Sequence, residues 1–172
     1  MDFNKIQKYV NKLKSKREIN LKHLSYGHTH IEDAMPSITD LFNNFGQNIE
    51  KAGGPSVIYT HNNKKVIGKT QFIVDLNNMP ESFKSKLQEI YDQIGDIPRE
   101  KSDTQIEDLF NKQVHTEYIN WSKKTNIHLR GTNNSKYLQL TIETYKKLGF
   151  IIHFIPAKGY KFNYDLIKFE KK

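Results

Sequence analysis

Hydrophobic residues recur along the chain with two different periods, and each period identifies a kind of element. Between residues 55 and 76, PSVIYTHNNKKVIGKTQFIVDL, two apolar runs flank Asn62-Asn63, a pair that accepts the positive φ of a tight turn. The second run, from Val66 to Val74, alternates apolar and polar residues, which is typical of a half-buried strand. We therefore predict a β-hairpin that needs helices or further strands on its apolar face.

Other stretches carry apolar residues three and four positions apart, the spacing of an amphipathic helix. Helices are predicted at residues 2–16, 37–52, 80–94, 102–121 and 134–148. Ser37 followed by Asp40 is typical of a capping box at the start of the second helix, and Gly149 is suited to end the fifth. Extended structure is predicted for three further segments, a short strand at 126–130 and a second hairpin made by 150–155 and 160–169.

These elements predict an α+β fold with about five helices and small antiparallel β-hairpins or a small sheet. Residues 95–103, GDIPREKSD, combine glycine, proline and charges, and are the best candidate for a boundary. We expect a helical N-terminal region with a hairpin at 1–97 and a helix-strand-helix-hairpin region at 98–172. The two regions are either separate domains or parts of one continuous domain.

The element order after residue 126 resembles the last part of a winged-helix domain, and Gly-Tyr-Lys-Phe at 159–162 is similar to the wing end of response-regulator DNA-binding domains. The resemblance implies that the exposed face of helix 134–148 enters the major groove while the hairpin turn touches phosphate. The residues that would make these contacts are Lys136, Gln139, Lys146, Lys147 and Lys158. In the alternative, an ordinary α+β core, residues 150–155 pair with 66–74.

The net charge of +8 is concentrated at the two ends of the chain. Residues 1–23 hold seven Lys/Arg against two acids, and residues 121–172 hold eleven against three. Basic ends around an acidic middle suit a polyanion, and Lys8 and Lys12 are further candidates for phosphate contacts. We predict a nucleic-acid-binding protein whose partner is DNA or RNA. Its frequent Lys, Asn and Ile indicate a phage or low-GC bacterial source.

Several kinds of chemistry and location are disfavoured by composition. The chain has no cysteine, which excludes disulfides and thiolate sites. No apolar run approaches the length of a membrane span, and the N-terminal residues lack the apolar segment of a secretory signal. We predict a cytoplasmic protein, in the bacterial host cytoplasm if a phage encodes it, with no membrane partner and no cofactor.

A histidine-rich run offers the best candidate for catalysis. The motif GHTH at 27–30 matches the GHTH of calcineurin-like phosphoesterases, in which both histidines bind a metal. Residues at i and i+2 of an extended chain share a face, so His28 and His30 can converge. The family's other motifs, D-x-H and G-N-H-D, do not occur here, and we assign neither the family nor a metal. A metal site formed by both histidines and one of Glu32 or Asp33 is an alternative.

The same histidines suit metal-independent chemistry. Residues 23–42 are loosely similar to the histidine-bearing region of a phage endoribonuclease that cuts early messages. Such enzymes use one histidine as general base and another group as acid. If His30 takes the catalytic place, the second histidine of that family falls on Asn43.

His28 and His30 are therefore the candidate catalytic residues of an alternative function, a small nuclease or phosphoester hydrolase. A second alternative is a phage structural or host-takeover protein that binds an acidic protein partner. These hypotheses make different demands on the fold. Nucleic-acid binding needs an exposed basic surface, whereas a nuclease or hydrolase needs the imidazoles of His28 and His30 to meet.

Overall fold

The computed structural model describes residues 27–31, 33–50, 53–62, 65–94, 96, 98–131 and 134–172. Within these ranges the chain forms four helices, a mixed four-stranded sheet and a separate two-stranded antiparallel hairpin, which confirms the α+β class. The helix predicted at residues 2–16, with Lys8 and Lys12, lies outside the described residues.

The sheet is built from the first and last parts of the chain. Its strand order is β1-β2-β3-β4, with β1 parallel to β2 and the other two pairs antiparallel. The strands are β1 (Gly27–Ile31), β2 (Ser56–Asn62), β3 (Lys65–Val74) and β4 (Phe150–Pro156). The predicted hairpin is confirmed as β2 and β3, which Asn62 and Lys65 close as the last pair.

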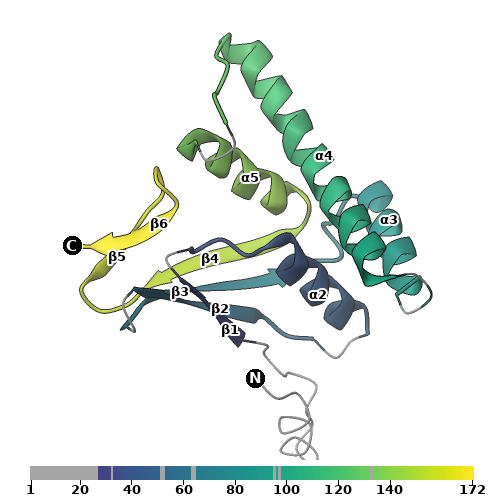
Figure 1. Ribbon diagram of the computed structural model, residues 1–172, viewed down its shortest axis with the longest axis horizontal. Coiled ribbons are helices and arrows are strands. Elements are labelled where there is room, and N and C mark those ends of the chain that lie inside the picture. Colours follow the sequence, from purple (N-terminus) through teal and green to yellow (C-terminus); the bar gives the residue numbers. More distant parts are fainter. Residues whose placement is uncertain are drawn as a thin grey trace, which may run out of the picture.

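All four helices lie on one side of this sheet (Figure 1). They are α2 (Ile38–Ile49), α3 (Glu81–Asp92), α4 (Arg99–Thr125) and α5 (Ser135–Lys147). The predicted capping box at Ser37 and Asp40 is confirmed, and the Asn134 side chain caps α5. Gly149 follows α5 with φ of +95°, the left-handed conformation that favours glycine at a helix C-terminus.

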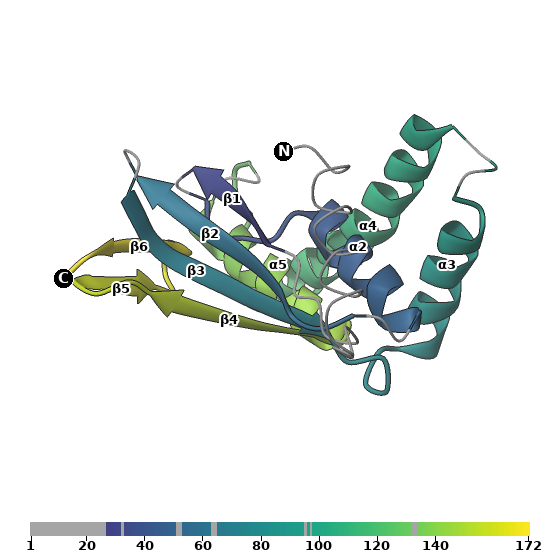
Figure 2. The same cartoon turned by 90° about the horizontal axis from the view of Figure 1, so that it is seen from below.

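The opposite face of the sheet is not covered by any described helix or strand, and Figure 2 shows it from below. Tyr59, Ile151 and Ile155 lie exposed on this face, whereas their neighbours Ile58, Phe150 and Ile152 are buried against the helices. Successive strand residues point to opposite faces of the sheet. Only the side chains on the helix-covered face lie between the sheet and the helices, where a site can be enclosed.

One hydrophobic core draws on both halves of the sequence. Phe110 of α4 is fully buried and makes ring contacts with Phe83 of α3, Tyr145 of α5 and Phe150 of β4 at centroid distances of 5.2, 5.8 and 5.9 Å. Because β3 also pairs with β4 along its length, the two regions divided at residue 97 share one sheet and one core.

The predicted wing hairpin at 150–169 is wrong. β4 pairs with β3 from Val74–Phe150 to Gly68–Pro156, and no described part of residues 126–130 is a strand. The remaining hairpin consists of β5 (Tyr160–Asn163) and β6 (Lys168–Lys171). β3 is long and alternates buried and more exposed residues as β4 does, whereas β5 has only four residues. Pairing of β4 with β3 therefore buries more apolar surface than pairing with β5.

The β5–β6 hairpin covers the end of the sheet through a close aromatic contact. Phe154 of β4 and Phe162 of β5 stack at 3.9 Å, and the ring of Phe169 lies directly against Gly68 of β3. A β-carbon at Gly68 would lie 2.5 Å from that ring, so the position needs glycine. The register shift just before it leaves Ile67 as the extra residue of a bulge.

Candidate functional site

His28 and His30 lie on the helix-covered side of the edge strand β1. Their exposure is intermediate, while residues 27, 29 and 31 between and around them are exposed. His28 pairs with Ile58 and His30 with Thr60, and both β2 residues are fully buried. The prediction that the two imidazoles share one face is confirmed, and that face is directed towards α2.

The chain between β1 and α2 fixes the start of the helix beside these imidazoles. The Thr60 hydroxyl donates to the Asp33 carbonyl at 3.1 Å, and the Thr70 hydroxyl donates to the Ala34 carbonyl at 2.6 Å. Both threonines are fully buried in the sheet. They therefore satisfy the polar backbone of the crossing segment and hold the first turn of α2, which contains Asp40, next to β1.

Asp40 completes a cluster with the two histidines. The Nε2 atoms of His28 and His30 are 2.8 Å apart, and Asp40 Oδ1 lies 3.2 Å from His28 Nε2. The other oxygen, Oδ2, lies 3.7 Å from His30 Nε2. One donor atom from each residue falls within 4.8 Å of the others. The side chains are 27%, 20% and 11% exposed respectively, which leaves the cluster partly open to solvent.

The capping box of α2 also orients the Asp40 carboxylate. The Ser37 backbone N–H and the Ser37 hydroxyl both donate to Oδ2, at 2.8 and 2.7 Å, while the Asp40 N–H donates back to the Ser37 oxygen. Two donors on Oδ2 fix the rotation of the carboxylate and turn Oδ1 towards His28. Carboxylates that bind metal ions are commonly oriented in this way, by a hydrogen bond from a neighbouring residue that is not itself a ligand.

The spacing of the donor atoms suits a metal ion. Zinc bonds to imidazole nitrogen and carboxylate oxygen are about 2.0–2.2 Å long, which places tetrahedral donors about 3.3 Å apart. The 3.2 Å between His28 Nε2 and Asp40 Oδ1 is close to that value, and the 2.8 Å between the two Nε2 atoms is somewhat shorter. The 3.7 Å from His30 Nε2 is to the other carboxylate oxygen, Oδ2. Without a metal, one imidazole can donate an N–H to the other, and the same atoms then form a pair of groups suited to proton transfer.

The carboxylate of the cluster is not one that sequence reasoning proposed. Asp33 instead accepts the Met35 N–H at 2.8 Å, and Glu32 lies outside the described residues. Asn43, the position of the second histidine in the ribonuclease comparison, is exposed on α2. The capping box predicts Asp40 in the first helical turn, but only the crossover from β1 to α2 brings it to the histidines.

The residues proposed for nucleic-acid contact are spread over α5 and the turn after β4. The Gln139 amide donates to the carbonyls of Tyr164 and Asp165 at 3.3 Å, and the Lys147 ammonium pairs with Glu117 at 2.5 Å. Lys146 and Lys158 are exposed. Lys136 lies over the ring of Trp121, with Nζ 5.7 Å from the ring centroid.

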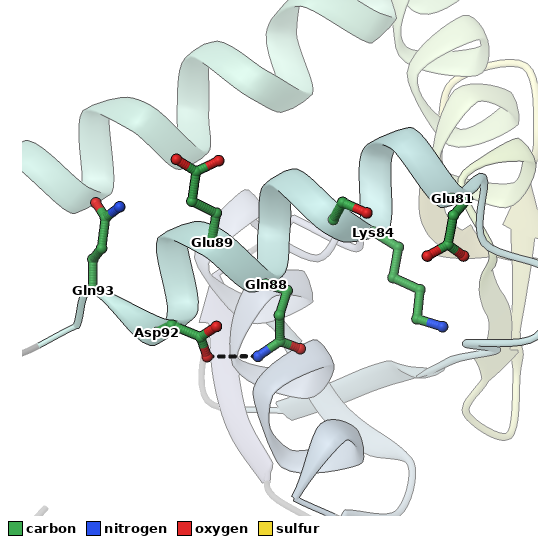
Figure 3. Close-up of a pocket in the computed structure, with 7 residues that line it drawn as sticks. Glu81, Lys84, Gln88, Glu89, Asp92 and Gln93 are labelled. Carbon is green, nitrogen blue, oxygen red and sulfur yellow. Dashed lines mark hydrogen bonds between the residues drawn. The ribbon is translucent and has the colours of Figure 1, made fainter.

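A shallow hollow also runs along the outer side of α3 (Figure 3). Its lining is polar, and the Gln88 amide donates to Asp92 at 2.7 Å within it. The lining residues are Glu81, Lys84, Ser85, Gln88, Glu89, Asp92 and Gln93. They lie one helical turn apart on a single solvent-facing helix, where such polar spacing is the ordinary pattern of a surface, and we assign no site there.

The chain matches no protein-family model, no curated protein and no solved structure. In the described part of the chain no helix combines the length and the apolar character needed to cross a membrane. The site must therefore be interpreted from its own geometry.

Proposed function

We propose that the chain is a metal-dependent phosphoester hydrolase and that His28, His30 and Asp40 hold its divalent metal ion. The convergence of two imidazole nitrogens and one carboxylate oxygen within 4.8 Å carries this proposal. Two histidines and one carboxylate are a donor set of catalytic zinc sites, in which water or substrate takes a further position. An ion of this class lowers the pKa of bound water and polarises a phosphoryl oxygen.

Each residue has a separate task in this proposal. His28 and His30 present Nε2 from a strand whose pairing with β2 fixes their spacing. Asp40 supplies a negatively charged oxygen, and Ser37 holds the carboxylate in place. The partial exposure of both imidazoles leaves room for substrate on the solvent side. The net charge of +8 supports an anionic substrate, and a phosphodiester of nucleic acid is the class that fits both features.

The test is a metal titration combined with a cleavage assay. Zinc and manganese are titrated into the metal-free protein by calorimetry, and hydrolysis of bis-p-nitrophenyl phosphate, RNA and DNA is followed. We expect His30→Ala and Asp40→Asn each to weaken metal affinity at least 100-fold and to abolish cleavage, since either change removes a ligand. His153→Ala is the matched control, because His153 is exposed on the uncovered face of the sheet.

Two results would contradict parts of this proposal. Unchanged metal affinity in both variants would show that the cluster is not the metal site. Metal binding that depends on the cluster, without cleavage of any of the substrates, would retain the site and overturn the hydrolase assignment. The unfolding temperature of each variant must be close to that of the wild type. A loss of metal affinity or cleavage then reports on the site and not on loss of the fold.

The contact between the histidines favours a second candidate, a metal-independent ribonuclease. At 2.8 Å the two Nε2 atoms are within hydrogen-bond distance, and an imidazole pair can supply both a general base and a general acid. Chelation separates the two candidates. RNA cleavage that persists in excess EDTA and is lost in His28→Ala supports acid–base chemistry, whereas cleavage that EDTA stops and zinc or manganese restores supports the metal.

A further inference from the structure

The last turns of α4 extend away from the sheet (Figure 1). The buried apolar residues of α4 are Ile106, Phe110 and Val114, and after Val114 its only buried residue is Ser122. The core therefore supports the first half of this helix, while the second half contacts α5 and the loop that follows α4. We call the surface formed by residues 118–131 and 134–137 the α4–α5 tip.

The α4–α5 tip is basic without any acidic residue. From Tyr118 to Ile142 the chain contains no Asp or Glu but four Lys/Arg: Lys123, Lys124, Arg130 and Lys136. The first three of these are exposed and Lys136 is half-buried. By contrast the first half of α4 and the neighbouring α3 carry seven Asp or Glu residues. Positive charges on a stretch of chain that has no acid of its own attract a polyanion.

Aromatic side chains lie among these charges. Tyr118 and Trp121 of α4 are 6.5 Å apart between ring centroids, and Tyr118 lies 5.9 Å from Tyr137 of α5. All three rings are half-buried. Tyr118 and Tyr137 join the two helices to each other. Trp121 instead has Lys136 above its ring, a contact between an aromatic face and a cation at the surface.

The loop that follows α4 is held against the helix. It turns at Asn126, whose φ of +56° is left-handed, and the Leu129 N–H then donates to the Tyr118 hydroxyl at 3.3 Å. Ser122 Oγ and His128 Nδ1 are hydrogen-bonded at 3.1 Å. These contacts fold the loop, with Arg130 directly after Leu129, back along the second half of α4 that carries Lys123 and Lys124.

We infer that the α4–α5 tip binds single-stranded nucleic acid, with phosphates at Lys123, Lys124 and Arg130 and a base stacked on Trp121. Basic residues combined with a partly exposed aromatic ring are the usual composition of such sites, and a base would stack on Trp121 in place of the Lys136 side chain. A single strand is favoured over a duplex because only unpaired bases offer a face for stacking. An acidic protein would satisfy the charges but would not require Trp121. The inference does not depend on the metal cluster.

Trp121 is the only tryptophan of the chain and therefore reports on its own contact. Oligothymidylate of about 12 nucleotides, within the usual site size for one domain, is titrated into the full chain in EDTA. We expect quenching of the tryptophan fluorescence, and affinity that falls steeply with salt because counterions are released. Binding in EDTA makes the outcome independent of the proposed hydrolase.

Variants separate stacking from charge. Trp121→Ala should weaken binding of a fluorescein-labelled oligothymidylate about 10-fold or more, and Trp121→Phe should recover part of the loss. Replacing Lys123, Lys124 and Arg130 with Gln should reduce the slope of log affinity against log salt by about 2, at about 0.7 for each phosphate contact on a single strand.

The matched control removes the same amount of charge elsewhere. Gln in place of Lys84, Lys86 and Lys112, on α3 and the first half of α4, should change affinity less than threefold. Any of three results would overturn the inference: no quenching of Trp121 on saturation, an equal loss in the control triple variant, or polyglutamate competing as well as oligothymidylate. The last result would instead assign the surface to an acidic protein partner.

Discussion

The His28–His30–Asp40 cluster and the α4–α5 tip are built on opposite principles. The cluster consists of three residues whose donor atoms meet within 4.8 Å, and its position is fixed by a strand, a crossing segment and a helix cap. The tip consists of charges accumulated along one acid-free stretch of sequence, with no single contact that defines it. A coordination site fails when one ligand is lost, whereas a polyanion surface weakens in steps. The two regions therefore call for different experiments.

The largest effect is expected where both regions depend on the same core. Phe110→Ala removes a fully buried ring that contacts α3, α5 and β4. We expect the free energy of unfolding to fall by about 3–5 kcal/mol, measured by urea denaturation. Metal binding and oligothymidylate binding should then be lost together as the urea concentration rises. Separate midpoints for the two activities would show that the regions unfold independently.

A smaller change should affect the cluster more than the tip. Asn44 of α2 is fully buried; its amide donates to the Gly54 carbonyl and Ser56 Oγ, and its side-chain oxygen accepts the Val74 N–H at 2.8 Å. Asn44→Ala leaves these buried groups without partners, and we expect a loss of about 2–3 kcal/mol.

Because Asn44 joins the helix of Asp40 to the sheet, the same variant should weaken metal affinity under conditions where it is still folded. Oligothymidylate affinity should stay within twofold of the wild type. Equal weakening of both activities at a temperature well below unfolding would contradict the separation of the two regions.

Ser37→Ala tests how the cluster is oriented without removing a ligand. Loss of the cap should lower the free energy of unfolding by about 1 kcal/mol. Metal affinity should fall by about 10- to 100-fold, because the hydroxyl no longer fixes Asp40 Oδ2. Calorimetric titration of Ser37→Thr provides the control, since threonine keeps the hydroxyl, and its affinity should return towards the wild-type value.

The smallest effect lies outside both regions. The Tyr91 hydroxyl of α3 donates to Glu50 after α2, and this hydrogen bond, with some burial, raises the pKa of Tyr91 to about 12. The folded chain keeps this proton to higher pH than an unfolded chain does, so the stabilisation is complete below about pH 10 and is lost as pH rises towards 12.

Tyr91→Phe should therefore cost about 1 kcal/mol at neutral pH. Its free energy of unfolding should also decline less steeply between pH 10 and 12 than that of the wild type. Burial raises the pKa of Tyr145 to about 12 in both proteins, so the difference between their curves isolates Tyr91. Parallel curves would contradict this assignment, and neither metal nor oligothymidylate affinity at neutral pH should change.

Sequence reasoning was most successful where structure depends on neighbouring residues. The capping box at Ser37, the hairpin of β2 and β3 and the shared face of His28 and His30 all follow from spacings of two to four residues or from a tight turn. The basic excess of residues 121–172 is likewise readable from the sequence, because charge is a property of one continuous stretch.

Features that depend on distant segments could not be read from the sequence. β4 was recognisable as an apolar strand, but nothing in its residues distinguishes β3 from β5 as its partner, and the winged-helix interpretation depended on that choice. The sequence predicts Asp40 as part of the capping box and not as the third member of the cluster. Its contact with His28 exists only once α2 packs next to β1. Buried Asn44 likewise satisfies groups ten or more residues away.

The pairing of β3 with β4 has a consequence for the order in which the protein is made. When β3 leaves the ribosome its hairpin partner β2 is already present, but three helices must still be synthesised before β4 follows. At about 5–20 residues per second the synthesis of these helices takes several seconds. During that time the edge of β3 that includes Phe72 lacks its final partner β4. Until β4 is made, the nascent hairpin therefore presents an unpaired strand edge to chaperones and to other chains. A stalled chain that ends before Phe150 should be captured by a strand-binding chaperone, whereas the full chain should not.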